Sequence, residues 1–189
     1  TGETAETLSL YGVGEKDTDE FGRRCLLARR LIERGVRFVC AVAGGGGGEL
    51  EWDAHSDIEK NHTRMAALTD QPTAALVQDL KRRGLLDSTV VLWGGEFGRS
   101  PESQGNKGRD HHNLGFSMWM AGGGIKGGQI VGATDAIGLR AIERPMHFRD
   151  IHTTMLHQLG LTQDGLSYLH LGRRERLTEV HGEVIKEIV

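Results

Sequence analysis

Three short apolar runs constrain the fold of this chain more than any other feature of its sequence. They cover residues 36–43 (VRFVCAVA), 89–93 (TVVLW) and 116–121 (FSMWMA). Apolar runs of this length that do not alternate with polar residues are typical of strands covered on both faces, as in parallel sheets. The sequence therefore predicts three buried strands, and we expect the first two to be parallel.

Helical periodicity fills much of the sequence between these runs. Thr18 is an N-cap candidate for a helix that ends near Gly35. A second helical stretch begins near Met65 and ends at Gly84, and Pro72 is expected to break or restart it. A third helix is predicted from a cap at Asp150 to Gly160. Helices that alternate with buried strands predict one α/β domain over residues 1–189, with a mostly parallel sheet between helical layers.

Charge and composition exclude several classes of partner. The chain of 189 residues has a net charge of −3, and its basic residues form no stripe that would attract nucleic acid. No apolar run approaches the roughly 20 residues that a membrane span needs, so no membrane contact is expected. Cys25 and Cys40 lack a CxxC spacing, and both are predicted to be small buried hydrophobes.

Glycine-rich stretches indicate where a site would lie. They cover residues 44–48, 94–98, 105–108 and 122–128. Ligands of open α/β sheets bind beyond the carboxyl ends of the strands, and the first two stretches begin at such ends. The last stretch is no P-loop, because Lys126 is followed by glycine in place of the Ser or Thr that binds magnesium. No nucleophile-elbow pattern surrounds a serine, which argues against a serine triad.

Four metal-ligand candidates follow or precede the predicted strands. Asp53 and His55 follow the first strand, Glu96 follows the second, and His111 precedes the third. If they converge, their oxygen and nitrogen atoms favour a divalent ion such as Zn, Mn or Fe over Ca. Each also has a simpler interpretation: Asp57 or Ser56 could cap a helix beside a solvated His55, and Glu96 could pair with Arg99.

Several motifs together resemble a known family. They are ARRLIERGVRFV, WDAHSDIEKNH, LKRRGLLDSTVVLWGGEFGRSP, GRDHHNLGFSMWMAGGGIKGG, ATDAIGLRAIE, DIHTTMLHQLGL and LTEVHGEVI. They are similar to a large bacterial family of unknown function that is classed with the sulfatases in the alkaline-phosphatase superfamily. The resemblance covers nearly the whole chain and implies a three-layer α/β/α sandwich, of which this region forms the C-terminal half. It also implies a bacterial protein that is exported or periplasmic, although these residues contain no export signal.

The resemblance also implies roles for individual residues. Asp53, His55 and His111 correspond to metal ligands, and Glu96 to a further ligand or a general base, although Phe97 stands where the superfamily has a histidine. Arg99 and Arg109 are the expected catalytic partners of a tetrahedral anion, through forked hydrogen bonds, and the alternative for both is a surface salt bridge. The superfamily nucleophile is expected outside these residues.

Two functions are compatible with these residues. The first is a metal-dependent hydrolase of small sulfate or phosphate esters, incomplete without the rest of its active site. The alternative is a non-catalytic module of the same fold that binds an anionic ligand or a partner protein. The sequence predicts no oligomeric state.

Overall fold

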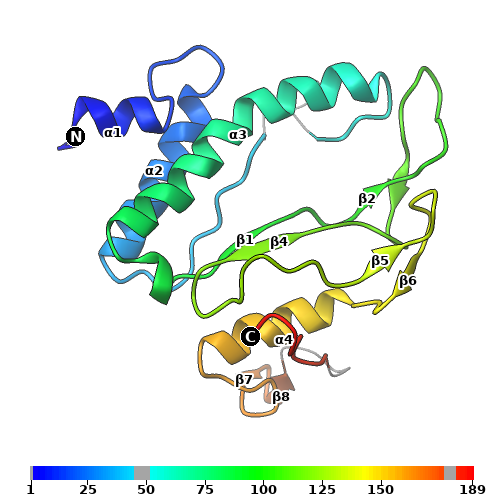
Figure 1. The fold of residues 1–189 in the computed structure, drawn as a ribbon. Coiled ribbons are helices and arrows are strands. Elements are labelled where there is room, and N and C mark those ends of the chain that lie inside the picture. The colour runs from blue at the N-terminus through cyan, green and yellow to red at the C-terminus, as the bar shows by residue number, and fades with distance from the viewer. Residues whose placement is uncertain (1, 45–51, 177–181) are drawn as a thin grey trace. The chain divides into compact units, whose positions relative to one another are not determined.

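The structure, a computed structural model, describes residues 2–44, 52–176 and 182–189 (Figure 1). Most of the first glycine-rich stretch, residues 45–48, and His181 lie outside the described residues. Two compact units make up the chain. The first consists of Thr1–Leu86 and Arg99–His111, and the second of Asp87–Gly98 and His112–Val189. The single domain expected from the sequence stays a prediction, and each unit is described by itself.

The first unit is built on three helices: α1 (Ala5–Leu10), α2 (Asp19–Glu33) and α3 (Ile58–Arg82). Both α1 and α2 pack against α3. Their apolar faces form a small core, whose buried members are Tyr11, Cys25, Leu26 and Ala75. The helices form because apolar residues recur three to four positions apart, so that each helix has one face to bury.

The helix predictions for this unit are partly confirmed. The helix after Thr18 is present as α2, but the Thr18 hydroxyl donates to the Gly12 carbonyl oxygen, 2.8 Å away, and does not cap the helix. The predicted break at Pro72 is wrong, because α3 continues through it. Pro72 is buried among the packed helices. Packing along the 25 residues of α3 outweighs the one backbone hydrogen bond that a proline removes.

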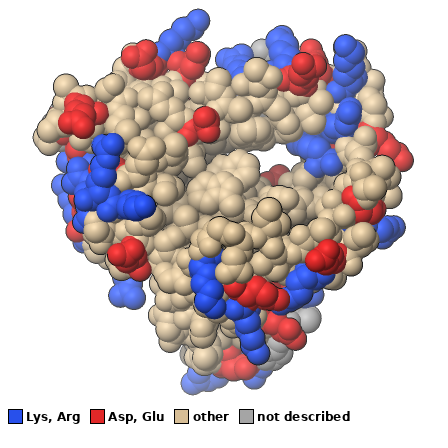
Figure 2. All heavy atoms as spheres, viewed as in Figure 1, with Lys and Arg blue, Asp and Glu red and all other residues tan. Residues whose placement is uncertain are grey.

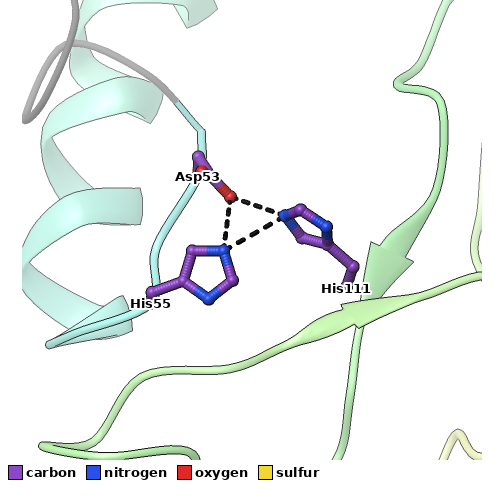
Figure 3. Close-up of side chains that lie close together, drawn as sticks. All are labelled: Asp53, His55 and His111. Carbon is purple, nitrogen blue, oxygen red and sulfur yellow. Dashed lines mark hydrogen bonds and ion pairs between the residues drawn. The ribbon is translucent and has the colours of Figure 1, made fainter.

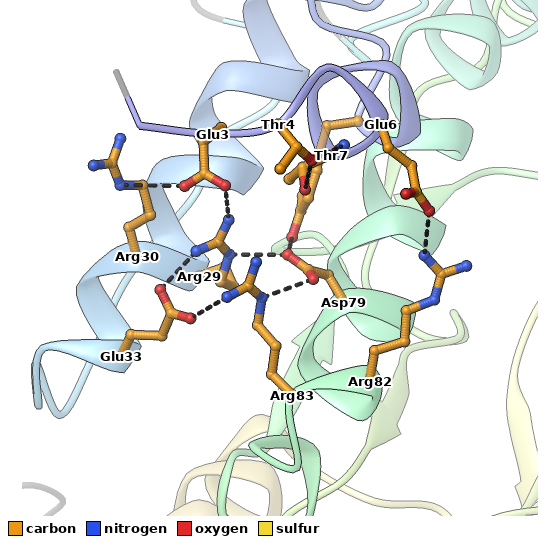
Figure 4. A network of polar contacts seen from close by, with 11 residues as sticks. Glu3, Thr4, Glu6, Thr7, Arg29, Arg30, Glu33, Asp79, Arg82 and Arg83 are labelled. Atoms are coloured by element: carbon orange, nitrogen blue, oxygen red, sulfur yellow. Dashed lines mark hydrogen bonds and ion pairs between the residues drawn. The ribbon is translucent and has the colours of Figure 1, made fainter.

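A buried arginine ties the three helical segments together (Figure 4). The Arg29 side chain on α2 is 2% exposed and lies 2.7 Å from Glu3 and 2.6 Å from Glu33. Its Nε is 2.9 Å from Asp79 Oδ2 on α3, which is close enough for an ion pair although the N–H is not aligned for a hydrogen bond. The Tyr11 hydroxyl donates to the same Asp79 oxygen over 3.1 Å. Opposite charges therefore compensate one another inside this unit.

The second unit contains short antiparallel strand pairs and one helix. Strand β1 (Val91–Trp93) pairs with β4 (Trp119–Ala121), with Leu92 opposite Met120. In the same unit, β5 (Ala133–Thr134) pairs with β6 (Ala141–Glu143). The helix α4 (Phe148–Gln158) follows, and after it β7 (Ser167–His170) pairs with β8 (Arg173–Arg176). The boundary between the units passes through β2 (Gly98–Arg99) and β3 (His111–His112) and through the 3-10 helix η2 (Leu86–Ser88).

Helix α4 confirms the third predicted helix, with a different cap. His147 is its N-cap, and Asp150 is the third helical residue of a capping box. The His147 ring accepts a hydrogen bond from the Arg149 N–H, and the Asp150 carboxylate accepts one from the His147 N–H. The C-terminal segment packs on this helix: the N–H of Ile185 donates to the Thr154 hydroxyl over 3.0 Å, and both residues are buried.

The predicted three-layer α/β/α sandwich with a parallel sheet is wrong. The described strands have two to four residues each and occur in two-stranded sheets, and the resolved pairings are antiparallel. Two of the predicted strands exist in shorter form, as β1 and β4, but they are antiparallel partners. Strand propensity specifies neither the partner nor the direction, because both depend on contacts far along the chain.

The predicted strand at residues 36–43 is also wrong. None of its residues is assigned to a strand, and Phe38 is 68% exposed. An apolar, β-branched run forms a strand only where a neighbouring strand accepts its hydrogen bonds and another layer covers it. In the described part of the chain, no strand pairs with this segment.

Basic and acidic side chains both occur on the surface that Figure 2 shows. On this face they are interspersed. Among the described helices, none is long and apolar enough to cross a membrane.

The Arg29 cluster yields a prediction about stability. Replacing Arg29 by Met should lower the free energy of unfolding by about 3 kcal/mol, because the carboxylates of Glu3 and Asp79 would lose the buried cation between them and keep only the partly exposed Arg30 and Arg83. Urea unfolding followed by circular dichroism measures the change. The control is Arg82→Met, because the one ion pair of Arg82 among the described residues is a long one of 4.0 Å to Glu6, and both side chains are exposed. This substitution should change the free energy of unfolding by less than about 0.5 kcal/mol. Equal effects of the two substitutions would contradict this assignment.

The two cysteines yield a second prediction. Cys25 is buried as expected, whereas Cys40 is exposed, so the prediction for Cys40 is wrong. Burial raises the pKa of the Cys25 thiol to about 12. At pH 8 a thiol reagent should therefore modify Cys40 rapidly and Cys25 only after denaturant is added. Mass spectrometry of the digested protein reports the sites, and the Cys40→Ser variant should remain unlabelled until it unfolds. Rapid labelling of that variant in native buffer would show that the helical core is not packed as described.

Candidate metal centre

Three of the four predicted metal ligands converge in the first unit (Figure 3). Asp53 Oδ1 lies 3.0 Å from His55 Nε2 and 2.8 Å from His111 Nε2, and the two histidine nitrogens are 3.2 Å apart. Figure 3 shows the three side chains pointing toward one another. They are 42–47% exposed, so a ligand could reach them from solvent. These residues form a group that could hold a metal ion.

Two segments far apart in the sequence position these side chains. The segment just before α3 and the loop before β3 are joined by three backbone hydrogen bonds: Arg109 N–H to the Ala54 carbonyl (3.0 Å), Asp57 N–H to Asn106 (2.8 Å) and Ile58 N–H to Lys107 (3.2 Å). Asp57 also caps α3, since its carboxylate accepts from the Lys60 N–H. The predicted Asp57 cap is therefore confirmed, and it exists together with the cluster rather than in place of it.

A close approach at Gly108 brings His55 into the cluster. Gly108 is buried, and a Cβ at this position would lie 2.0 Å from the His55 carbonyl oxygen and 2.6 Å from the Ser56 nitrogen. Only glycine permits this separation of the two backbones. The sequence places Gly108 in a glycine-rich loop, but it does not reveal that the contact partner of this glycine is the backbone at His55.

Arg99 anchors the carboxylate of the cluster. Its guanidinium donates to Asp53 Oδ1 over 2.5 Å, to the Trp52 carbonyl over 3.2 Å and to the Arg109 carbonyl over 3.3 Å. The hydrogen bond from Arg99, followed by that from His111, lowers the pKa of Asp53 to about 2. The carboxylate is therefore ionised at neutral pH, as a metal ligand must be. The structure places Arg99 beside a ligand, and its catalytic role toward a substrate stays a prediction.

A residue that the sequence did not single out completes the cluster. Gln104 Oε1 lies 2.8 Å from His55 Nδ1, on the side of the ring opposite the metal-ligand candidates. Nothing in its polar loop, SQGNKGR, distinguishes this glutamine from a solvated turn residue. Its importance depends on the long-range contact between the two segments, which a pattern in a single sequence does not reveal.

The metal-ligand group includes neither of the other two predicted site residues, Glu96 and Arg109. Glu96 is exposed and belongs to the second unit, so its role as a ligand or general base stays a prediction. Arg109 belongs to the same unit as the cluster, and its side chain donates to the Gly108 carbonyl over 2.9 Å. A guanidinium has five N–H donors, so one such bond leaves others that can bind an anion.

The donor set fits a metal ion. One carboxylate oxygen and two imidazole nitrogens are ordinary ligands of transition metals, and three protein ligands beside open positions are typical of catalytic sites. The arrangement thus defines a helical and short-stranded protein with a candidate site for one metal ion, partly open to solvent.

Comparison with known proteins places the chain in a family. A family model described as "Protein of unknown function (DUF1501)" matches residues 1–189, so the chain belongs to this family. No curated protein and no solved structure matches it.

The family match corrects the resemblance drawn from the motifs. The family model covers the whole chain, and nothing in the comparisons indicates a sulfatase or a member of the alkaline-phosphatase superfamily. That assignment is therefore wrong, in agreement with the absence of a parallel sheet from the described residues. Similarity of motifs does not by itself establish a fold or an activity.

The close approach at Gly108 gives a test of the site geometry. Gly108→Ala should lower the free energy of unfolding by about 1–3 kcal/mol, because the added methyl group would displace the backbone at His55. Gly127→Ala is the control: its backbone has an ordinary φ and nothing lies within 4 Å of the added Cβ. Urea denaturation measures both variants. Unchanged stability in Gly108→Ala would contradict the packing of the two segments.

Proposed function

We propose that this chain binds a divalent metal ion through Asp53, His55 and His111 and that the site hydrolyses small anionic esters of sulfate or phosphate. The observation that carries the proposal is the convergence of Asp53 Oδ1 and the two Nε2 atoms to within 3.2 Å of one another, although His111 is more than 50 residues from the other two. Each of these residues was a ligand candidate from the sequence alone. Convergence of independent candidates is more specific than any single Asp or His.

The metal is Zn, Mn or Fe rather than Ca. Calcium requires six to eight oxygen ligands, whereas this site offers two imidazole nitrogens and one carboxylate. The positive charge of Arg99 already balances Asp53, so binding depends strongly on the histidines. Imidazole ligands favour transition metals over the alkaline-earth ions.

In this proposal, different residues of the first unit bind the metal ion, position a ligand and bind the substrate anion. Asp53, His55 and His111 hold the ion, and Arg99 keeps the carboxylate ionised and in place. Arg109 supplies N–H donors to the anionic part of the ester. A bound divalent ion would polarise the ester and lower the pKa of a coordinated water, which would then be the nucleophile. Glu96, in the other unit, takes no part in this proposal.

One observation favours a second function, that of a non-catalytic module that binds an anionic ligand or a partner protein. Arg99 already pairs with Asp53, so the cluster is neutralised without a metal ion. In that case the arginines would recognise the anion and the histidines would be part of a hydrogen-bonded cluster. The two functions differ in whether metal is bound.

Metal binding is the first test. Isothermal titration calorimetry with Zn²⁺ should show one ion bound per chain. His55→Ala and His111→Ala each remove a ligand, so each should weaken binding by more than the roughly 10–100-fold that is typical when a residue supporting a ligand is lost. His157→Ala, in α4 of the other unit, is the matched control and should bind like the parent protein. Equal affinity in all four proteins would exclude the proposed ligands.

Ester hydrolysis is the second test. The metal-loaded protein should release the aryl group of an aryl phosphate or aryl sulfate slowly, and both a chelator and His55→Ala should abolish the release. Metal binding without any turnover would contradict the hydrolase part of the proposal and leave the metal site itself in place. Turnover that survives both the chelator and the substitution would come from another site and would contradict the proposal.

A further inference from the structure

We propose that Gln104 determines which nitrogen of His55 binds metal, by holding the ring in the tautomer that carries its hydrogen on Nδ1. This inference rests on the metal site proposed above and assigns a positioning role to a residue outside the ligand set. The acceptor is the Gln104 side-chain carbonyl oxygen, 2.8 Å from His55 Nδ1. Because this oxygen can only accept, the contact requires a hydrogen on Nδ1, and in the neutral ring Nε2 then presents its lone pair.

The lone pair of Nε2 then faces the other ligands. Nε2 of His55 lies 3.0 Å from Asp53 Oδ1 and 3.2 Å from His111 Nε2. In water, neutral histidine carries its hydrogen mostly on Nε2, which would block metal binding at this atom. The Asp53 oxygen could also favour that hydrogen, but it already accepts a hydrogen bond from the Arg99 guanidinium. Gln104 therefore reverses the intrinsic preference of the ring and prepares Nε2 as a ligand before any ion arrives.

The backbone holds Gln104 in position for this contact. Gln104 and Gly108 exchange two hydrogen bonds, of 2.9 Å from the Gln104 N–H and 2.8 Å from the Gly108 N–H. Gly108 packs directly against the His55 carbonyl. The loop thus fixes the backbone of Gln104 relative to the His55 backbone, and the exposed Gln104 side chain spans the remaining distance to the imidazole ring.

The test compares the metal-free protein and three variants by long-range ¹H–¹⁵N correlation NMR of the histidine rings at pH 9, where free histidine is neutral. Gln104→Met removes the acceptor at similar volume, and Gln104→Glu retains an acceptor. Gln129→Met is the matched control in an exposed position of the other unit. The His55 signal is identified by its loss in His55→Ala.

The expected result is a hydrogen on Nδ1 of His55 in the parent protein, in Gln104→Glu and in Gln129→Met, and mainly on Nε2 in Gln104→Met. Zn²⁺ affinity should fall about 10–100-fold in Gln104→Met alone. A His55 hydrogen on Nε2 in the parent protein, or the same tautomer in Gln104→Met, would overturn the inference. Failure of the parent protein to bind Zn²⁺ would instead overturn the proposed function, because the tautomer is measured without metal.

Discussion

The candidate site depends on the backbone hydrogen bonds that join the segment before α3 to the loop before β3. These bonds connect residues 54, 57 and 58 to residues 106, 107 and 109. Without them, Asp53 and His55 would have no fixed relation to His111, because more than 50 residues of chain separate them. Gly108 allows the two backbones to approach, and the Asp57 cap aligns the start of α3 with the same loop. The positions of the three ligand side chains therefore depend on hydrogen bonds between backbone groups of neighbouring residues.

Electrostatics then determine what the site can bind. Arg99 lowers the pKa of Asp53 to about 2 and at the same time balances its charge. A cation that enters must gain more from the two imidazole nitrogens than it loses by repulsion from the guanidinium. In the proposed metal site this condition would favour metals that bind nitrogen strongly, and a tautomer set by Gln104 would therefore matter for affinity.

The sequence predicted the local structure of the chain better than its long-range organisation. The helix after Thr18 and strands within residues 89–93 and 116–121 exist, because their patterns reflect periodicity within one segment. The described residues contain neither the strand at residues 36–43 nor the parallel sheet, since both would require partners that no short pattern specifies. The predicted interruption at Pro72 is wrong for a related reason: the packing of α3 outweighs the tendency of proline to end a helix.

Site prediction followed the same division. Asp53, His55 and His111 could be selected because chemistry restricts which residues bind metals. Arg99 was noticed, but its contact with Asp53 rather than with an outside anion became evident only from the structure. Gln104 was missed altogether, because a glutamine in a polar loop has no distinguishing spacing.

The central claim is that Asp53, His55 and His111 bind one metal ion. The most direct measurement is an anomalous-difference map from crystals soaked in Zn²⁺, recorded above and below the zinc absorption edge. The claim predicts one peak at roughly 2.0–2.2 Å from Asp53 Oδ1 and from Nε2 of both histidines. A map without a peak among these three atoms, from crystals in which the cluster is ordered and accessible, would contradict it.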